Sequence, residues 1–226
     1  MSANSNDAAA QAQQAVWPPV TPAGAARELQ GVTAPAGFRA AGVTAGIKAS
    51  GRPDMALVVN EGPQRSAAAV FTSNRVAAAP VHWSREVIKD GRVDAVILNS
   101  GGANACTGAP GFQDTHRTAE EVAGLLGASA ADVIVCSTGL IGERLPMEKI
   151  LSGAADATAA LATDGGPDAA VSIMTTDTVP KQAVRTLGAV TIGGMAKGAG
   201  MLAPALATML VVVTTDAVIG SEELDA

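Results

Sequence analysis

The strongest constraint on the fold is a series of short, uninterrupted apolar runs separated by turns and polar stretches. Runs of this kind are typical of strands that are covered on both faces. A turn at residues 51–54, which contains Pro53, divides the first region into two strands. The runs predict strands over residues 42–50, 55–60, 67–74, 94–100 and 132–137.

Two helices are predicted between these strands. Thr118 and Glu121 form a Ser/Thr-x-x-Glu capping box, followed by apolar residues at helical spacing. A second helix is expected to begin at Pro146, a favourable first-turn residue, and to end before Gly165. Strands interleaved with helices indicate the α/β class. Because the chain shows no internal repeat and no clean linker, we expect one folded domain from residue 31 onward.

Composition excludes several classes of protein. Apolar residues make up 48% and charged residues 16%, which excludes a chain that is disordered throughout. The formal net charge is −6, whereas nucleic-acid binders normally carry clusters of basic residues, so we do not expect a nucleic-acid binder. Two cysteines, Cys106 and Cys136, fit neither a disulfide scaffold nor a zinc site and suggest a reducing, cytoplasmic setting. No metal site or cofactor is expected.

The remaining stretches argue against a membrane protein. Residues 1–30 are rich in Ala, Gln, Ser, Asn and Pro without helical or strand periodicity, and we expect a disordered extension. They contain no targeting signal. The most apolar stretch, residues 198–213, has 16 residues and includes Pro204, so it falls short of a membrane span. We therefore expect a soluble protein.

The sequence TMLVVVTTDA, from Thr208 onward, is the most strand-like of all. A central strand needs neighbours on both sides, and only nineteen residues, Thr208 to Ala226, are present. This predicts a chain that continues elsewhere, or a fragment.

Four segments combine glycines with hydroxyl or charged side chains. The first, NSGGANACTG at residues 99–108, follows a predicted strand and could expose backbone N–H groups to an anion. It matches no nucleotide-binding motif, and a tight buried loop explains it equally well. Cys106 lies in this loop, and a cysteine nucleophile would need His82 or His116 beside it. Packing of a small residue is the alternative for the cysteine.

The second and third segments carry hydroxyl groups. In CSTGLIGERLPM, residues 136–147, a hydroxyl and a backbone N–H lie together at a strand end and could stabilise an oxyanion. An ordinary Thr-Gly turn is the alternative reading. In IMTTDTVPK, residues 173–181, the polar residues Thr175, Thr176 and Asp177 could form only a local capping or Asx-turn arrangement.

The fourth segment is GGMAKGAGMLAPALATML, residues 193–210. Lys197 is surrounded by glycines, and a solvated lysine on a turn would be the ordinary interpretation. However, Lys197 stands eleven residues before Thr208, which heads the apolar strand. An Ala–Thr junction in this place is the arrangement that a self-cleaving protein with an N-terminal nucleophile uses.

Together, and in this order, the four segments resemble the ornithine acetyltransferase family, the bifunctional glutamate N-acetyltransferases of arginine biosynthesis. The resemblance runs from about Gly31 to Asp216. It implies an α/β, layered helix–sheet fold of the N-terminal-nucleophile-like type, incomplete here at the C-terminus. It also implies self-cleavage between Ala207 and Thr208. Residues 31–207 would then be the α-chain part and residues 208–226 the truncated start of a β chain, in a heterotetramer of two α and two β chains.

The resemblance assigns roles to individual residues. Thr208 would be the nucleophile, taking the acetyl group from N-acetylornithine and passing it to glutamate. Thr138 and Gly139 would form the oxyanion hole, while Thr175 and Lys197 would bind substrate together with Thr208. Some members also use acetyl-CoA as the acetyl donor, and the sequence leaves that open.

The short region after Thr208 keeps other readings open. Family β chains are about as long as the α chain and contribute further substrate-binding residues, which Glu222 and Glu223 do not match. We expect the chain alone to be inactive and poorly soluble. The alternatives are an inactive fragment, an amino-acid-binding remnant, or a related self-cleaving amidohydrolase, because an acyl-enzyme can pass to water as well as to an amine.

Overall fold

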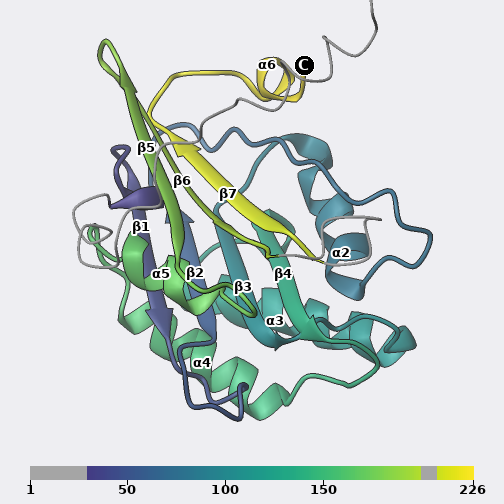
Figure 1. The fold of residues 1–226 in the computed structure, drawn as a ribbon. Helices are drawn as coiled ribbons and strands as arrows, with labels where there is room; N and C mark the ends of the chain where they lie inside the picture. Colours follow the sequence, from purple (N-terminus) through teal and green to yellow (C-terminus); the bar gives the residue numbers. More distant parts are fainter. Residues whose placement is uncertain (1–29, 200–207) are drawn as a thin grey trace, which may run out of the picture.

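The fold consists of two β-sheets and five α-helices in the part of the chain that the computed structural model describes, residues 30–199 and 208–226. The predicted extension up to residue 29, and Ala207, lie outside the described residues. Figure 1 labels the α-helices and strands. The elements follow one another along the chain in this order: η2 (Gly31–Thr33), β1 (Phe38–Val43), β2 (Met55–Asn60), α2 (Ala79–Val87), η3 (Ile88–Asp90), β3 (Ala95–Gly102), α3 (Gly108–Leu126), η4 (Ala130–Asp132), β4 (Val133–Leu140), α4 (Met147–Ala159), α5 (Gly166–Ser172), β5 (Lys181–Leu187), β6 (Val190–Lys197), β7 (Leu210–Thr215) and α6 (Ser221–Asp225).

The first sheet has the strand order β1-β2-β3-β4. β1 and β3 both pair antiparallel with β2, while β3 and β4 are parallel and are joined through α3. Five of the six residues of β2 are buried, which confirms the prediction of a strand covered on both faces. β3 and β4 are also confirmed, and each extends two to three residues beyond the predicted end, into the glycine segments.

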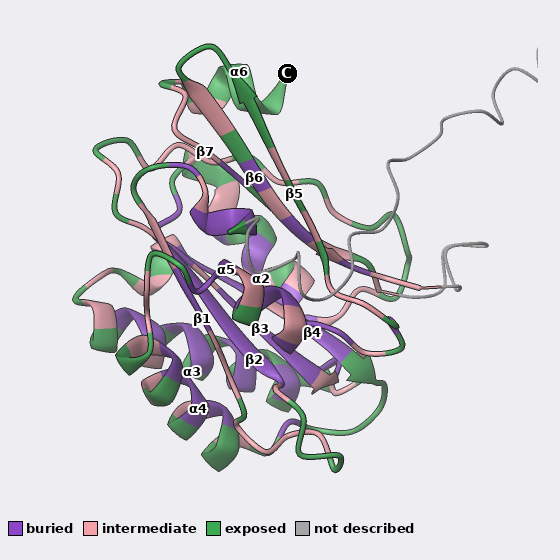
Figure 2. Cartoon of the chain, turned by 60° about the vertical axis from the view of Figure 1, so that its left-hand side comes forward, coloured by how far each residue is buried: buried purple, intermediate pink, exposed green. Residues whose placement is uncertain are grey.

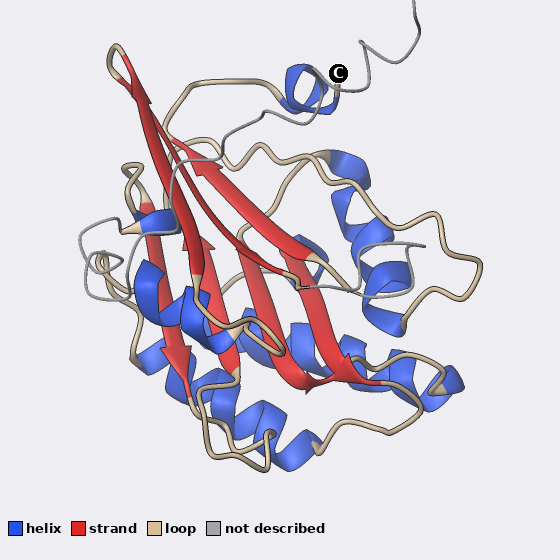
Figure 3. Cartoon of the chain, viewed as in Figure 1, coloured by secondary structure: helices blue, strands red, loops and turns tan. Residues whose placement is uncertain are grey.

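Different layers cover the two faces of this sheet. Met55 and Leu57 face one side, where they pack with residues of α3 and α4. Ala56 and Val58 face the other side, where they pack with α5 and with Met195 of the second sheet. Figure 3 shows α3 and α4 behind the first sheet and the second sheet in front of it. The α/β layered class predicted from the sequence is therefore confirmed.

The second sheet, with strand order β5-β6-β7, is antiparallel. The sequence pattern missed β5 and β6, because the glycines of β6 suggested a turn. Gly193 is required in the strand, since a Cβ there would lie 2.1 Å from the carbonyl oxygen of Gly31. β7 was expected to be a central strand, yet among the described residues it pairs only with β6. Its residues alternate in exposure, as Figure 2 shows for this sheet.

Three further predictions were wrong in detail. Residues 67–74 form no strand, and Val70 is fully exposed. Alanine and valine make up half of this stretch, which gave it the appearance of a strand. Among the described residues, no strand pairs with it. Residues 44–50 leave β1 at Val43 and form a loop that wraps around the carboxylate of Asp54.

The capping box was also misassigned. α3 begins at Gly108, ten residues before Thr118. The Thr118 hydroxyl donates to the carbonyl oxygen of Asp114, so it bonds back within the helix instead of capping its start. The helix predicted from Pro146 is confirmed as α4, with Pro146 immediately before its first residue.

Candidate active site

Two glycine turns meet where the parallel strands β3 and β4 end. Asn99 pairs in register with Ser137, and the Ser137 hydroxyl donates to the Asn99 side chain over 2.6 Å. Two positions further on, Gly101 faces Gly139, and both have positive φ angles, 120° and 134°. A Cβ on Gly139 would lie 2.5 Å from the carbonyl carbon of Gly101. A side chain on Gly139 would therefore push the two strands apart, whereas one on Gly101 would meet Ile47 and Lys48 of the loop between β1 and β2.

A loop between β1 and β2 covers this junction. The buried carboxylate of Asp54 accepts hydrogen bonds from the backbone N–H groups of Ala45, Ile47 and Lys48 at 2.6–2.8 Å. The bent loop places the side chains of Ile47 and Lys48 against Gly101. Burial lowers the pKa of Lys48, and the charge of Lys197 lowers it further. Two lysines therefore lie near the glycine junction.

Lys197 connects the second sheet to the first. Its side chain extends from the end of β6, and its Nζ donates to the Thr138 hydroxyl oxygen over 3.1 Å. The same Nζ lies 3.5 Å from the backbone carbonyl oxygen of Thr208. Lys197 and Thr138 are both almost completely buried. Burial lowers the pKa of Lys197, the carboxylate of Asp177 opposes this, and the ammonium of Lys181 adds to it.

Asp177 joins the stretch from Thr175 to Lys181 to the end of β6. Its carboxylate accepts hydrogen bonds from the backbone N–H of Thr175 at 3.2 Å and of Gly198 at 2.8 Å, and from the Lys181 ammonium. Burial favours the neutral acid, but these hydrogen bonds outweigh it and lower the pKa of Asp177 to about 2. Asp177 is therefore ionised near neutral pH and fixes the residue that follows Lys197.

The structure brings together most of the residues singled out in the sequence. Thr138, Lys197 and Thr208 form one hydrogen-bonded group, and Gly139 adjoins it through the glycine junction. Thr175 is connected to the group only through Asp177. Ala207 lies outside the described residues. Sequence reasoning treated Asp177 as a local turn residue and missed Lys181 and Asp54, because no local pattern shows that a carboxylate is buried.

Asn104 in the glycine loop has a structural role, but Cys106 is exposed with φ 58°, so the alternative of a packed small residue was wrong for this cysteine. Asn104 is fully buried with φ 48°, and its amide donates to the carbonyl oxygen of Gly111 and to the Thr115 hydroxyl, fixing the start of α3. This favours the tight-loop reading over an anion site. Burial raises the pKa of the Cys136 thiol to about 12, so this cysteine is protonated near neutral pH and is a poor nucleophile.

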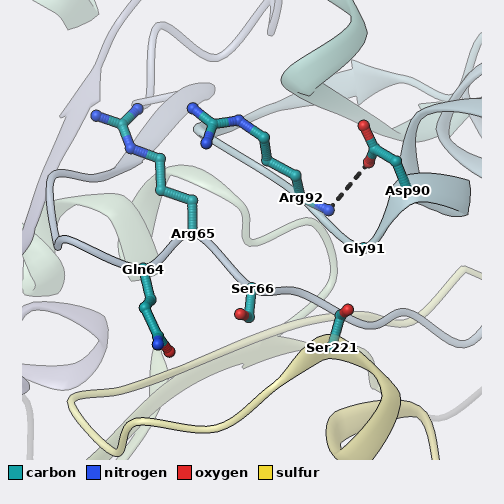
Figure 4. Close-up of a pocket in the computed structure, with 7 residues that line it drawn as sticks. All are labelled: Gln64, Arg65, Ser66, Asp90, Gly91, Arg92 and Ser221. Carbon is teal, nitrogen blue, oxygen red and sulfur yellow. Dashed lines mark hydrogen bonds between the residues drawn. The ribbon is translucent and has the colours of Figure 1, made fainter.

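A surface hollow of about 310 Å³ lies elsewhere, between the segment at Gln64–Ser66, the turn at Asp90–Arg92 and Ser221. Figure 4 shows both of its arginine side chains extending away from the serines. Arg65 and Arg92 each form an ion pair with Asp94, at 2.6 Å and 2.8 Å. Arg92 also pairs with Asp132 at 3.3 Å, so two carboxylates face the two guanidinium groups. The hollow includes none of the residues of the Thr138–Lys197–Thr208 group.

The described residues form neither a metal-type cluster nor a helix that could span a membrane. No group of three or more histidine, cysteine, aspartate or glutamate side chains is placed to hold a metal ion within residues 30–199 and 208–226. Over the same residues, no helix is long and apolar enough to cross a bilayer.

The described residues define an α/β protein of two packed sheets, in which a buried lysine connects two threonine residues beside a glycine turn. The sequence matches the profile of the ArgJ family over residues 39–226. The chain therefore belongs to the ArgJ family.

Individual relatives agree with this assignment. The chain is 66% identical over 194 residues to the arginine biosynthesis bifunctional protein ArgJ of Streptomyces coelicolor, covering 86% of this chain and 51% of that protein. It is 62% identical over 204 residues to the ArgJ protein of Mycobacterium leprae, covering 87% and 50%. The chain thus spans about half the length of the curated relatives that it matches.

Solved structures share the fold. A crystal structure of Mycobacterium tuberculosis ornithine acetyltransferase complexed with ornithine superposes with a TM-score of 0.72 at 57% identity, covering 80% of this chain and 96% of that one. The arginine biosynthesis bifunctional protein argJ from Bacillus halodurans superposes with a TM-score of 0.62 at 33% identity, covering 82% and 88%.

The glycine junction generates the first prediction. Gly139→Ala is expected to lower the free energy of unfolding by about 2 kcal/mol or more, because its Cβ would meet the Gly101 backbone and its φ is unfavourable. Gly124→Ala is the matched control, because Gly124 is an exposed glycine of α3 with open space around it. Alanine there should raise the free energy of unfolding by about 0.5–1 kcal/mol, since it favours the helix more than glycine does. Urea denaturation of both variants measures the difference. Equal stability of the two would contradict the close approach.

Asp177 generates a second prediction, on stability against pH. Its pKa of about 2 lies below the ordinary value of 3.8, so the unfolded chain binds the proton first as the pH falls. Its contribution, about 2 kcal/mol, should be complete above about pH 4 and lost as the pH falls towards 2. The free energy of unfolding, measured with urea, should differ less between pH 6 and pH 3 in Asp177→Asn than in the unmodified chain. The exposed Asp164→Asn variant is the control and should keep the full effect.

Proposed function

We propose that the protein to which this chain belongs transfers an acetyl group from N-acetylornithine to glutamate through an acetyl-Thr208 intermediate. The observation that supports this most directly is the Lys197 ammonium, which contacts both the Thr138 hydroxyl and the backbone of Thr208. This pair of contacts supports a site in which the expected nucleophile and the expected oxyanion turn are neighbours. Because the chain spans half the length of its relatives, the activity is proposed for a protein of the relatives' length.

Self-cleavage would activate the nucleophile. Inside a continuous chain, the Thr208 hydroxyl has no base beside it along the backbone. The Thr208 oxygen would attack the carbonyl carbon of Ala207 and displace the Thr208 nitrogen. One water molecule would then hydrolyse the resulting ester, leaving a carboxylate on Ala207 and an α-amino group on Thr208. An α-amine has an ordinary pKa of about 7.7 to 8.0, so a large share of it can accept a proton near neutral pH. This amine would remove the proton from the threonine's own hydroxyl.

Thr138 is suited to stabilising the oxyanion because of its bond with Lys197. An ammonium has only donors, so in this hydrogen bond the Thr138 oxygen is the acceptor. The proton of the Thr138 hydroxyl is then free to be donated to another group. Together with the backbone N–H of Gly139, it would provide two donors for the charge that develops on the acetyl oxygen.

The reaction then proceeds in two balanced steps. The Thr208 oxygen attacks the acetyl carbonyl of N-acetylornithine, the amide C–N bond breaks, and the amine of Thr208 passes its proton to the departing ornithine nitrogen. The amino group of glutamate attacks the resulting ester, and the threonine oxygen leaves and regains a proton. Thr175 and Lys197 would help to hold the substrates. No cofactor is required; acetyl-CoA would enter only as a second acetyl donor.

Two comparisons support the proposal. A related crystal structure holds ornithine, the product of the first step. The chain covers 48% of a curated M. tuberculosis relative but 96% of the solved M. tuberculosis chain, so that solved chain is about half the curated length. This agrees with cleavage into two chains, and on this basis we propose residues 31–207 as the α-chain part and residues 208–226 as the start of the β chain. A heterotetramer in the cytoplasm is part of the same proposal.

The third prediction tests the nucleophile. In a protein extended to the length of the relatives, Thr208→Ala should abolish both cleavage and acetyl transfer, because it removes the attacking oxygen of both reactions. Intact mass spectrometry reports cleavage, and ornithine release reports transfer. Thr186→Ala, at an exposed position of β5, is the matched control and should keep both. Normal turnover in the Thr208→Ala variant would exclude Thr208 as the nucleophile.

The fourth prediction separates transfer from its alternatives. Incubation of the extended protein with N-acetylornithine should release ornithine only when glutamate is present, apart from one acetylation per site. Continuous release without glutamate would instead indicate an amidohydrolase that passes the acetyl group to water. Absence of any release would indicate an inactive fragment or a remnant that only binds amino acids. Replacing N-acetylornithine with acetyl-CoA tests the second donor.

A further inference from the structure

Asp177 forms a hydrogen bond with Gly198, the residue that follows Lys197. Among the described residues, none of its hydrogen bonds reaches Thr138 or Thr208. Its side chain is only 1% exposed. It belongs to neither sheet, lying in the turn between α5 and β5. One oxygen accepts from the Gly198 N–H and from Lys181, and the other accepts from the Thr175 N–H.

These three partners come from the segments that carry the site. Gly198 follows Lys197 directly at the end of β6, and Lys181 is the first residue of β5. Thr175 begins the turn. Because backbone N–H groups are rigid donors, the carboxylate fixes the relative positions of the turn and of the strand end from which the Lys197 side chain extends.

The charge of Asp177 matters as well as its position. Lys197 is almost completely buried, and burial disfavours an ammonium. The charged groups that act on Lys197 are Asp177, which favours its protonated form, and Lys181 and Lys48, which oppose it. A neutral Lys197 amine could accept a hydrogen bond from the Thr138 hydroxyl, which would then no longer be free to donate elsewhere.

We propose that Asp177 is a positioning residue for Lys197, holding the end of β6 in place and keeping the Lys197 side chain protonated while it donates to Thr138. Lys181 has the opposite electrostatic effect on Lys197 while it shares the same carboxylate. The proposal rests on the proposed function for its kinetic consequences, but the protonation state of Lys197 can be measured without any turnover.

The test uses two substitutions that break the same ion pair from opposite sides, in the protein extended to the length of its relatives. Asp177→Asn removes the negative charge beside Lys197, so Lys197 should lose its proton at lower pH. Lys181→Met removes a positive charge, so Lys197 should lose its proton at higher pH. The 13Cε signal of Lys197, identified by its loss in Lys197→Arg, is followed by NMR as the pH is raised.

A purely structural role for the Asp177–Lys181 pair would shift both variants in the same direction, or neither. Opposite shifts support the proposal, and shifts of the same sign, or no shift in either variant, overturn it. Thermal unfolding of both variants shows whether each is folded. If Asp177→Asn does not fold, Lys181→Met alone decides: an upward shift supports the proposal, and no shift or a downward one contradicts it.

Kinetics provide a second readout. The alkaline limb of the pH–rate profile should move to lower pH in Asp177→Asn and to higher pH in Lys181→Met. Asp177→Glu keeps the charge but displaces the carboxylate, so it should lower kcat/KM, by up to about a hundredfold, while leaving that limb near its original position. Opposite NMR shifts without any acetyl transfer would contradict the proposed function alone and leave the role of Asp177 supported.

Discussion

The site depends on the parallel pairing of β3 and β4, because this pairing brings two glycine turns into contact at one edge of the first sheet. Antiparallel strands would have carried the segments NSGG and STGL to opposite edges. The final register positions place Gly101 against Gly139, where there is no room for a Cβ on Gly139. Asn99 and Ser137 close the pairing by a side-chain hydrogen bond immediately before the turns. Thr138 is consequently held in a rigid, buried strand and not in a loop, which suits a hydroxyl that must point in a fixed direction.

The burial of two charged side chains, Lys197 and Asp177, is the second constraint on the fold. A buried lysine is costly unless its ammonium is hydrogen-bonded and a counter-charge lies nearby. Lys197 has the Thr138 hydroxyl and the Thr208 carbonyl as acceptors, and Asp177 supplies the nearby negative charge. Asp177 in turn avoids the cost of its own burial through two backbone N–H groups and Lys181. The turn after α5 is therefore part of the electrostatic design of the site, although it lies outside both sheets.

The sequence predicted the apolar strands of the first sheet well, because β2, β3 and β4 are continuous apolar runs that only a doubly covered strand explains. It failed where context decides the outcome. Thr118 and Glu121 matched a capping box, but the glycine-rich start of α3 is stabilised ten residues earlier by the Asn104 side chain. Thr138, Lys197 and Thr208 could be named only through the resemblance of their segments to a family. Asp177 was named only as a local turn residue, because its distant partner Gly198 is brought to it by the pairing of β5 with β6.

The register between β6 and β7 links the packing of the hydrophobic core to the position of Thr208 beside Lys197. Lys197 faces Leu210 at the end of their pairing, and Thr208 stands two residues before that position. Leu210 and Val212 face the core between the sheets, while Val211 and Val213 face outward. A slip of one residue would turn Val211 and Val213 inward, reverse every side chain of β7, and move Thr208 by about 3.4 Å relative to Lys197. The apolar packing of Leu210 and Val212 thus specifies the one register in which the Lys197 ammonium lies between Thr138 and Thr208.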